Sequence, residues 1–193
     1  YIGSAMCKNC HDGADKGDMF THWTKTGHAK AYETLASAEA KEVAKKLGIE
    51  DPQKSEQCLK CHVTAFGADK KELKASFKME LGVQCETCHG PGETHQKKRM
   101  AEAMKPGTTP SPITADEIQS GRSIDTCTKC HTKESPTYKP FCFKERMQHV
   151  EHLDPRKQRS EEELAKLRAT DAADCEVCGA TKEAAAKKEG EGK

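Results

Sequence analysis

Residues 82–92 read Gly82-Val83-Gln84-Cys85-Glu86-Thr87-Cys88-His89-Gly90-Pro91-Gly92. Two cysteines stand with two residues between them, and a histidine follows the second cysteine directly. With this spacing, both thiols can form thioether bonds to one porphyrin while the imidazole binds its iron as the fifth ligand. The stretch therefore predicts the attachment of one c-type haem.

The same pattern occurs three more times in the chain. We call each Cys-Cys-His set a haem grip and number the four along the sequence: Cys7, Cys10 and His11; Cys58, Cys61 and His62; Cys85, Cys88 and His89; Cys127, Cys130 and His131. Zinc knuckles are the alternative, because C-x-x-C is also a common zinc spacing. Histidine is only 9 of 193 residues, and a zinc ribbon does not need it after every pair. The pattern favours four covalently bound haems c.

The composition argues against an ordinary protein core. Apolar residues make up 34% of the chain, aromatic residues 5% and charged residues 33%, which is a poor stock for a self-sufficient interior. Four porphyrins would supply the missing apolar surface, so the chain without haem should be largely unfolded. We expect a mainly α fold with long loops, little or no sheet and a core of stacked haems. Residues 1–180 should form one tetrahaem domain, followed by a charged tail at 181–193.

Charge and hydropathy exclude two classes of partner. The formal net charge is +1, with basic and acidic residues intermixed, so no nucleic-acid footprint is expected. No apolar run approaches the ~20 residues that a membrane span needs. The first residue is Tyr1 rather than Met, which fits a mature exported chain. We expect an extracellular or cell-surface location, with the periplasm as the alternative.

Local patterns predict several elements outside the grips. Ser37 and Gly48 bracket an amphipathic helix, and residues 93–104 form a second one with His95 in its first turn. Capping-box spacings predict a short helix after Thr114, with Glu117 at the third position, and another from Ser160 to about residue 168. Residues 63–83 should be a loop or a short hairpin. Residues 143–153 look helical and would present His149 and His152 on one face.

Five histidines remain after the grips are assigned: His22, His28, His95, His149 and His152. Four irons need four sixth ligands, so this supply favours six-coordinate bis-histidine haems that pass electrons rather than bind substrate. His22 and His28 lie six positions apart, about 120° around a helix, so they are candidates for two different irons. Methionine ligation is the alternative, with six available: Met6, Met19, Met79, Met100, Met104 and Met147.

Three stretches carry a resemblance to a known family. They are Trp23-Thr24-Lys25-Thr26-Gly27-His28-Ala29-Lys30-Ala31, then Cys61-His62-Val63 with Phe66-Gly67, and residues 82–92. From Cys7 to His152 the chain resembles the tetrahaem cytochromes that accept electrons from hydroxylamine oxidoreductase. It also resembles the tetrahaem outer-membrane cytochromes of metal-reducing bacteria that polymerise into extracellular filaments.

The resemblance implies a set of sixth ligands. His95 would serve the His11 haem, His28 the His89 haem, and His149 or His152 the His131 haem. The second haem, at His62, resembles an open five-coordinate site in that family. This chain differs by carrying His22 and a second histidine in residues 143–153. His22 of a neighbouring subunit, a ligand from the same chain, or no protein ligand at all would complete the His62 iron; an open iron would bind a small molecule such as nitric oxide.

Three cysteines lie outside the grips: Cys142, Cys175 and Cys178. In an oxidising compartment a disulfide is favoured, either between Cys175 and Cys178 or from one of them to Cys142. A three-thiolate metal site and a redox-active dithiol are the alternatives.

These observations predict an electron-transfer protein rather than an enzyme. The specific expectation is the repeating subunit of an extracellular cytochrome filament, a homopolymer with intersubunit histidine ligation. A redox protein would donate electrons, and an extracellular metal oxide or electrode would accept them. The alternatives are a monomeric periplasmic shuttle and a reductase of a small nitrogen oxide at an open His62 haem.

Overall fold

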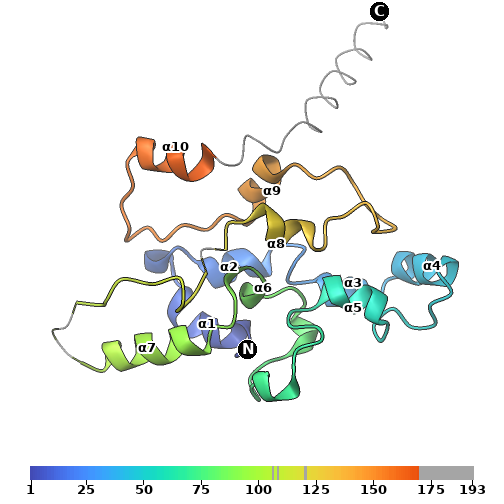
Figure 1. Cartoon of the computed structure of the whole chain (residues 1–193), viewed down its shortest axis with the longest axis horizontal. Helices are drawn as coiled ribbons and strands as arrows, with labels where there is room; N and C mark the ends of the chain where they lie inside the picture. The colour runs from blue at the N-terminus through green and yellow to red at the C-terminus, as the bar shows by residue number, and fades with distance from the viewer. Residues whose placement is uncertain (106, 108, 120, 170–193) are drawn as a thin grey trace, which may run out of the picture.

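The computed structural model describes residues 1–105, 107, 109–119 and 121–169 (Figure 1). In these ranges every regular element is helical and no strand occurs, which confirms the predicted mainly α class. The α-helices are α1 (Ser4–His11), α2 (Met19–Thr24), α3 (Ala31–Thr34), α4 (Ala38–Lys46), α5 (Glu56–His62), α6 (Cys85–His89), α7 (Glu93–Ala103), α8 (Ile124–Thr128), α9 (Phe143–Val150) and α10 (Glu161–Ala169). Three short 3₁₀ turns join them: η1 (Ala14–Lys16), η2 (Lys70–Glu72) and η3 (Met79–Leu81).

The apolar core of the protein part is small. Its buried cluster consists of Leu35, Leu59 and Val63, with Tyr32 and Cys58 packed against it. Most of the helices are short and joined by long irregular segments (Figure 1). Burial of so few apolar side chains cannot hold separate short helices together, because isolated helices of this length are unstable in water. The core of stacked haems remains a prediction. The small apolar core of the protein part is compatible with it.

Several predicted elements are confirmed. The Ser37 hydroxyl caps α4 by accepting a hydrogen bond from the amide of Ala40 at 3.1 Å. A capping box opens α10: the Ser160 amide donates to Glu163 Oε2 at 2.7 Å, and the Glu163 amide donates to Ser160 Oγ at 3.2 Å. Helix α7 carries His95 in its first turn. Residues 63–83 contain η2 and η3 but no hairpin.

Two predicted elements are wrong in detail. Residues 115–117 form a turn rather than a helix, because the side chain of Glu117 does not cap this segment but reaches across to α7. Helix α9 ends at Val150, one turn earlier than predicted, and Glu151 continues in extended backbone. His152 therefore lies beyond the helix and does not share a helical face with His149.

A buried polar frame fixes the segment that carries the third grip. Gln84 is 1% exposed; its Oε1 accepts from the Ser4 amide at 2.8 Å and its Nε2 donates to the Lys78 carbonyl at 2.9 Å. The side chain joins the N-terminal segment to the loop before α6. Helix α6 accordingly lies in the middle of the molecule, with α1 packed against it (Figure 1).

The carboxylate of Glu86 adds a second set of contacts to this frame. It is 3% exposed and accepts backbone hydrogen bonds from Ile2 at 2.9 Å, Gly3 at 2.8 Å and Gly92 at 2.7 Å. One side chain inside the third grip thus satisfies amides on both sides of it. The first and third grips are tied together before any cofactor is considered.

The remaining predictions concern membrane spans, the cysteines outside the grips and the bounds of the domain. No helix in the described ranges is long and apolar enough to cross a membrane. Cys142 is buried and disulfide-bonded, whereas Cys175, Cys178 and the tail at 181–193 lie outside the described residues. The predicted single domain over residues 1–180 remains a prediction.

Candidate functional site: four haem grips

Each grip is built on a single helical turn. The first and second grips end α1 and α5, and the third occupies the whole of α6. The fourth begins in α8 at Cys127 and continues into the turn that holds Cys130 and His131. Residues three and four positions apart share one face of a helix, so the two thiols and the imidazole of each grip point the same way. All eight grip thiols are free of disulfides, as attachment to haem requires.

The thiols also show how the grips neighbour one another. The thiols of Cys7 and Cys85 form a hydrogen bond. This bond, together with burial, raises the pKa of Cys7, and the same bond lowers the pKa of Cys85. Burial and the nearby Cys127 raise the pKa of Cys88 to about 11. Burial and the neighbouring Cys61 raise the pKa of Cys130 to about 12. The first grip therefore adjoins the third, and the fourth adjoins both the third and the second.

Histidine rings face one another in pairs at a characteristic spacing. The ring centres are 6.0 Å apart for His11 and His95, 6.2 Å for His28 and His131, and 5.9 Å for His89 and His152. A metal binds an imidazole nitrogen at about 2.0–2.1 Å, as for zinc, and the ring centre lies about 1.1 Å behind it, so two rings on opposite sides of one metal are separated by about 6.2 Å. These three pairs, each of which contains a grip histidine, thus match the spacing of bis-histidine ligation; the rings of His22 and His152, neither of which belongs to a grip, are also 6.2 Å apart.

The pairs differ in part from those that the resemblance implied. His95 faces His11, as expected. His28 faces His131 rather than His89, and His152 faces His89 rather than His131. The difference follows from the extended backbone after α9, which carries His152 away from the helix.

His62 has no facing imidazole in the described part of the chain. Its Nδ1 lies 2.6 Å from the carbonyl of Ala31, and no ring contact joins it to another histidine. Among the described residues, the geometry therefore offers a candidate sixth ligand to three grips and none to the second.

Hydrogen bonds select the tautomer that haem ligation needs. The Nδ1 atoms of His62, His89 and His152 donate to backbone carbonyls at 2.6 Å, 3.0 Å and 2.8 Å. His95 Nδ1 lies 2.8 Å from Glu117 Oε1. A nitrogen that donates in this way leaves Nε2 of the same ring with its lone pair free for a metal.

Burial keeps several of these rings neutral. Desolvation lowers the pKa of His11, His28, His131 and His152 below the ordinary histidine value. Only the neutral ring has a lone pair to offer. Phe141 stacks on His131 with ring centres 4.6 Å apart, which fixes the plane of that ligand. The free thiols of the grips, the spacing of the paired histidine rings and the free Nε2 atoms together fit the attachment and ligation of haem c.

The two remaining histidines are placed differently. His22 Nε2 lies 3.1 Å from the carbonyl of His149, so the nitrogen that would bind iron is engaged inside the chain. Its ring centre is 6.2 Å from that of His152, which already faces His89. The side chain of His149 is exposed. His149 is therefore the more exposed of the two, and its ring is not held by the contact that engages His22 Nε2.

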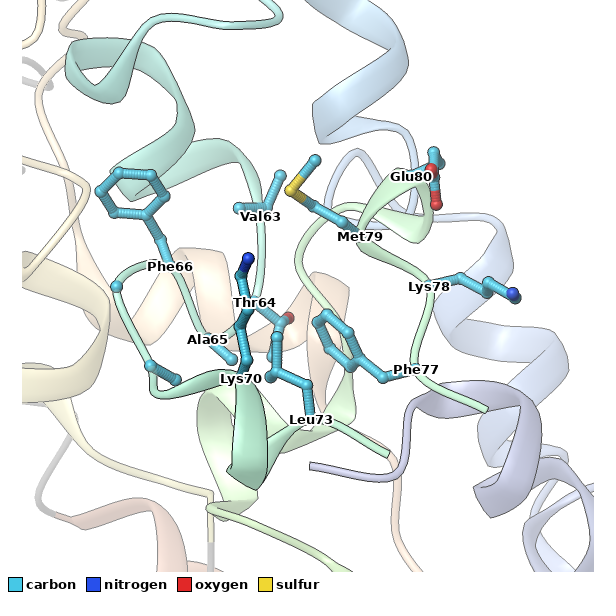
Figure 2. Close-up of a pocket in the computed structure, with 12 residues that line it drawn as sticks. Val63, Thr64, Ala65, Phe66, Lys70, Leu73, Phe77, Lys78, Met79 and Glu80 are labelled. Carbon is cyan, nitrogen blue, oxygen red and sulfur yellow. The ribbon is translucent and has the colours of Figure 1, made fainter. Parts of the chain in front are cut away.

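The zinc alternative receives no support from the described residues, where no three His, Cys, Asp or Glu side chains converge to hold a metal ion. A pocket of about 450 Å³ lies beside the chain that follows the second grip, and Figure 2 shows its apolar side chains, including Val63, Phe77 and Met79. His62 is not among the residues that line this pocket. The pocket therefore adds nothing to the hypothesis of a ligand site on the His62 iron.

Gly121 leads to a prediction about the third grip. Its φ is +78°, and a Cβ at this position would stand 2.6 Å from Cε1 of His89. We expect Gly121→Ala to push the His89 ring out of line and convert one low-spin haem to high-spin, as measured by absorption and electron paramagnetic resonance. Gly48→Ala is the control, because it carries a similar φ of +70° with nothing within 4 Å. Equal spectra for both variants would show that Gly121 does not position the ring.

Comparison with known proteins agrees with this geometry. Residues 6–90 match the family model described as cytochrome c554 and c-prime. Over 139 residues the chain is 34% identical to cytochrome c-554 of Nitrosomonas europaea, a match that covers 68% of this chain and 57% of that relative. No solved structure matches the chain. With its four grips, the chain is a multihaem c-type cytochrome similar to cytochrome c-554, and its cofactors are four covalently bound haems c.

Proposed function

We propose that the protein is an exported electron-transfer protein that exchanges electrons with other redox proteins. The observation that carries the proposal is the set of three histidine pairs, each with ring centres about 6 Å apart. At these three irons, two imidazoles leave no position for a substrate, which suits electron transfer. Each haem, when bound, supplies a one-electron iron couple.

The protein's own residues have three tasks in this proposal. The grips fix the order of the attachment sites, since Cys7 adjoins Cys85 and Cys130 adjoins Cys61. The backbone carbonyls that accept from Nδ1 hold His62, His89 and His152 in the tautomer that leaves Nε2 free. Partial burial of the His11, His28, His89, His95 and His152 rings limits the access of water to these ligands. No general acid, base or nucleophile is required, so the proposal includes no catalytic residue.

Single histidine variants test the ligand assignment. We expect His28→Ala to convert one low-spin haem to high-spin, because Ala removes the ring that faces His131. Changing the exposed His149 to Ala should leave the spin states of the dispersed protein unchanged. Quantified electron paramagnetic resonance of the oxidised holoproteins measures both. Loss of a low-spin signal in the His149 variant alone would contradict the assignment.

A subunit of an extracellular filament is the second candidate function, and one specific observation favours it. The second grip has no facing imidazole within the described chain, and His149 is exposed. A neighbouring copy that donates His149 to the His62 iron would complete the ligand and link the copies, which makes a homopolymer at the cell surface. A monomeric periplasmic shuttle is the rival. The similarity to cytochrome c-554 fits both.

Assembly state separates these candidates. If the filament forms, purified holoprotein should appear as uniform fibres by electron microscopy, with all haems low-spin, and His149→Ala should disperse the fibres. The shuttle should instead run as a monomer on gel filtration with one high-spin haem. Fibres that survive the His149 change would exclude His149 as the linking ligand.

A further inference from the structure

Glu117 makes contacts that the haem grips alone do not require. It is 3% exposed, and its Oε1 lies 2.8 Å from Nδ1 of His95. The same carboxylate accepts from Lys98 Nζ at 2.9 Å and from Arg99 Nε at 2.6 Å, and it forms a close ion pair with Arg99 Nη2. All three partners come from α7, twenty residues or so earlier in the chain.

The other ring nitrogens with a hydrogen bond offer a clear contrast. Nδ1 of His62, His89 and His152 faces neutral backbone carbonyls. Among the described residues, His95 is the histidine whose Nδ1 meets a carboxylate. A carboxylate withdraws the ring proton more strongly than an amide oxygen and so makes the imidazole a better electron donor to a metal.

The opposite ring strengthens the contrast. Nδ1 of His11 is buried and meets no hydrogen-bond partner among the described residues, so none of them strengthens this ring as Glu117 strengthens His95. Of these two rings, His95 is therefore the one whose electron donation to a metal is strengthened by a hydrogen bond. Lys98 and Arg99 hold the carboxylate in place against the ring.

We propose that Glu117 is a positioning residue that raises the basicity of His95 and thereby lowers the reduction potential of the haem held between His11 and His95. The proposal rests on the proposed function, because it requires His95 to be an iron ligand. A better donor stabilises the oxidised iron over the reduced iron. The haem of the first grip then has a lower reduction potential than it would have without Glu117, which favours electron flow from this haem to its neighbours.

The test is a spectroelectrochemical titration of the Glu117→Gln holoprotein. Gln keeps the size and an oxygen acceptor but removes the charge. Changes in such outer partners typically alter a metal equilibrium by about 10–100-fold, and a tenfold change is about 59 mV for one electron. We therefore expect one of the four reduction potentials to rise by the equivalent of one or two tenfold changes, about 59 mV each. Every low-spin signal should persist.

Glu93→Gln is the matched control. Glu93 lies on the same helix two residues before His95 and pairs with Lys74 and Lys97 on the surface, so its change removes one charge without touching the ring. A rise of equal size in both variants would show a general charge effect and overturn the proposal. An unchanged potential in Glu117→Gln would overturn it too.

Two more variants make the outcome unambiguous. Glu117→Asp keeps the charge and shortens the reach to His95, so a smaller rise of the same potential is expected, and this variant serves if Gln does not fold. His95→Ala identifies the affected haem by its change of spin state. If His95→Ala leaves all haems unchanged, the ligand assignment fails; if it converts one haem and Glu117→Gln shifts a different potential, only the role of Glu117 fails.

Discussion

Without its haems, the chain is expected to lose most of its helical structure. The variant with alanine at all eight grip cysteines cannot attach haem; the changed positions are Cys7, Cys10, Cys58, Cys61, Cys85, Cys88, Cys127 and Cys130. Its far-ultraviolet circular dichroism should resemble that of an unfolded chain, without a cooperative thermal transition. The holoprotein should show strong helical ellipticity and a cooperative melt.

The physical reason lies in how little the protein part buries. Only eight apolar side chains are buried in the described ranges, and just three of them, Leu35, Leu59 and Val63, form a cluster, with two partly buried neighbours. Ordering a residue costs about 1–2 kcal/mol of backbone entropy, which so small a cluster cannot offset over more than a hundred residues. A partial variant that removes only the fourth grip is the control and should lose helix locally. A cooperative melt in the eight-cysteine variant would contradict the proposed haem core.

Replacing Glu86 with alanine is expected to destabilise the holoprotein strongly. The change leaves the buried amides of Ile2, Gly3 and Gly92 without their acceptor. Hydrogen bonds to a charged group contribute about 1.5–3 kcal/mol each, so three of them lead us to expect a loss of roughly 5 kcal/mol in the free energy of unfolding. In a protein of this size that corresponds to a fall in Tm of about 10 °C.

The exposed carboxylate of Glu80 provides the matched control. Glu80→Ala lies on the turn before the same grip and should leave Tm within about 1–2 °C, since surface changes usually stay within ±0.5 kcal/mol. Differential scanning calorimetry of both holoproteins makes the comparison. Similar melting temperatures would show that Glu86 does not tie the N-terminal segment to the third grip.

The sequence was most informative where chemistry is local. The spacing of Cys85, Cys88 and His89 fixes a haem grip within one helical turn, and the Ser160–Glu163 capping box forms because its partners are three residues apart. The class of fold and the cofactor could therefore be predicted. The low share of apolar residues also anticipated the small protein core.

The features that the sequence did not reveal are contacts between distant segments. Thr114 and Glu117 have capping-box spacing, yet Glu117 is drawn to Arg99 and His95, eighteen and twenty-two positions away. The approach of His28 to His131 depends on the path of the hundred or so residues between them, which periodicity does not encode. No local signal marks Gly121 as a neighbour of His89. Each of these depends on tertiary packing, so the sequence pattern alone could not reveal it.

The most direct test of the account is the spin state of the four irons in dispersed, fully oxidised holoprotein. Quantified electron paramagnetic resonance should give three low-spin irons, for the pairs His11–His95, His28–His131 and His89–His152, and one high-spin iron at His62. Two or more high-spin irons, or four low-spin irons in a protein shown to be monomeric, would contradict the ligand set derived from the structure.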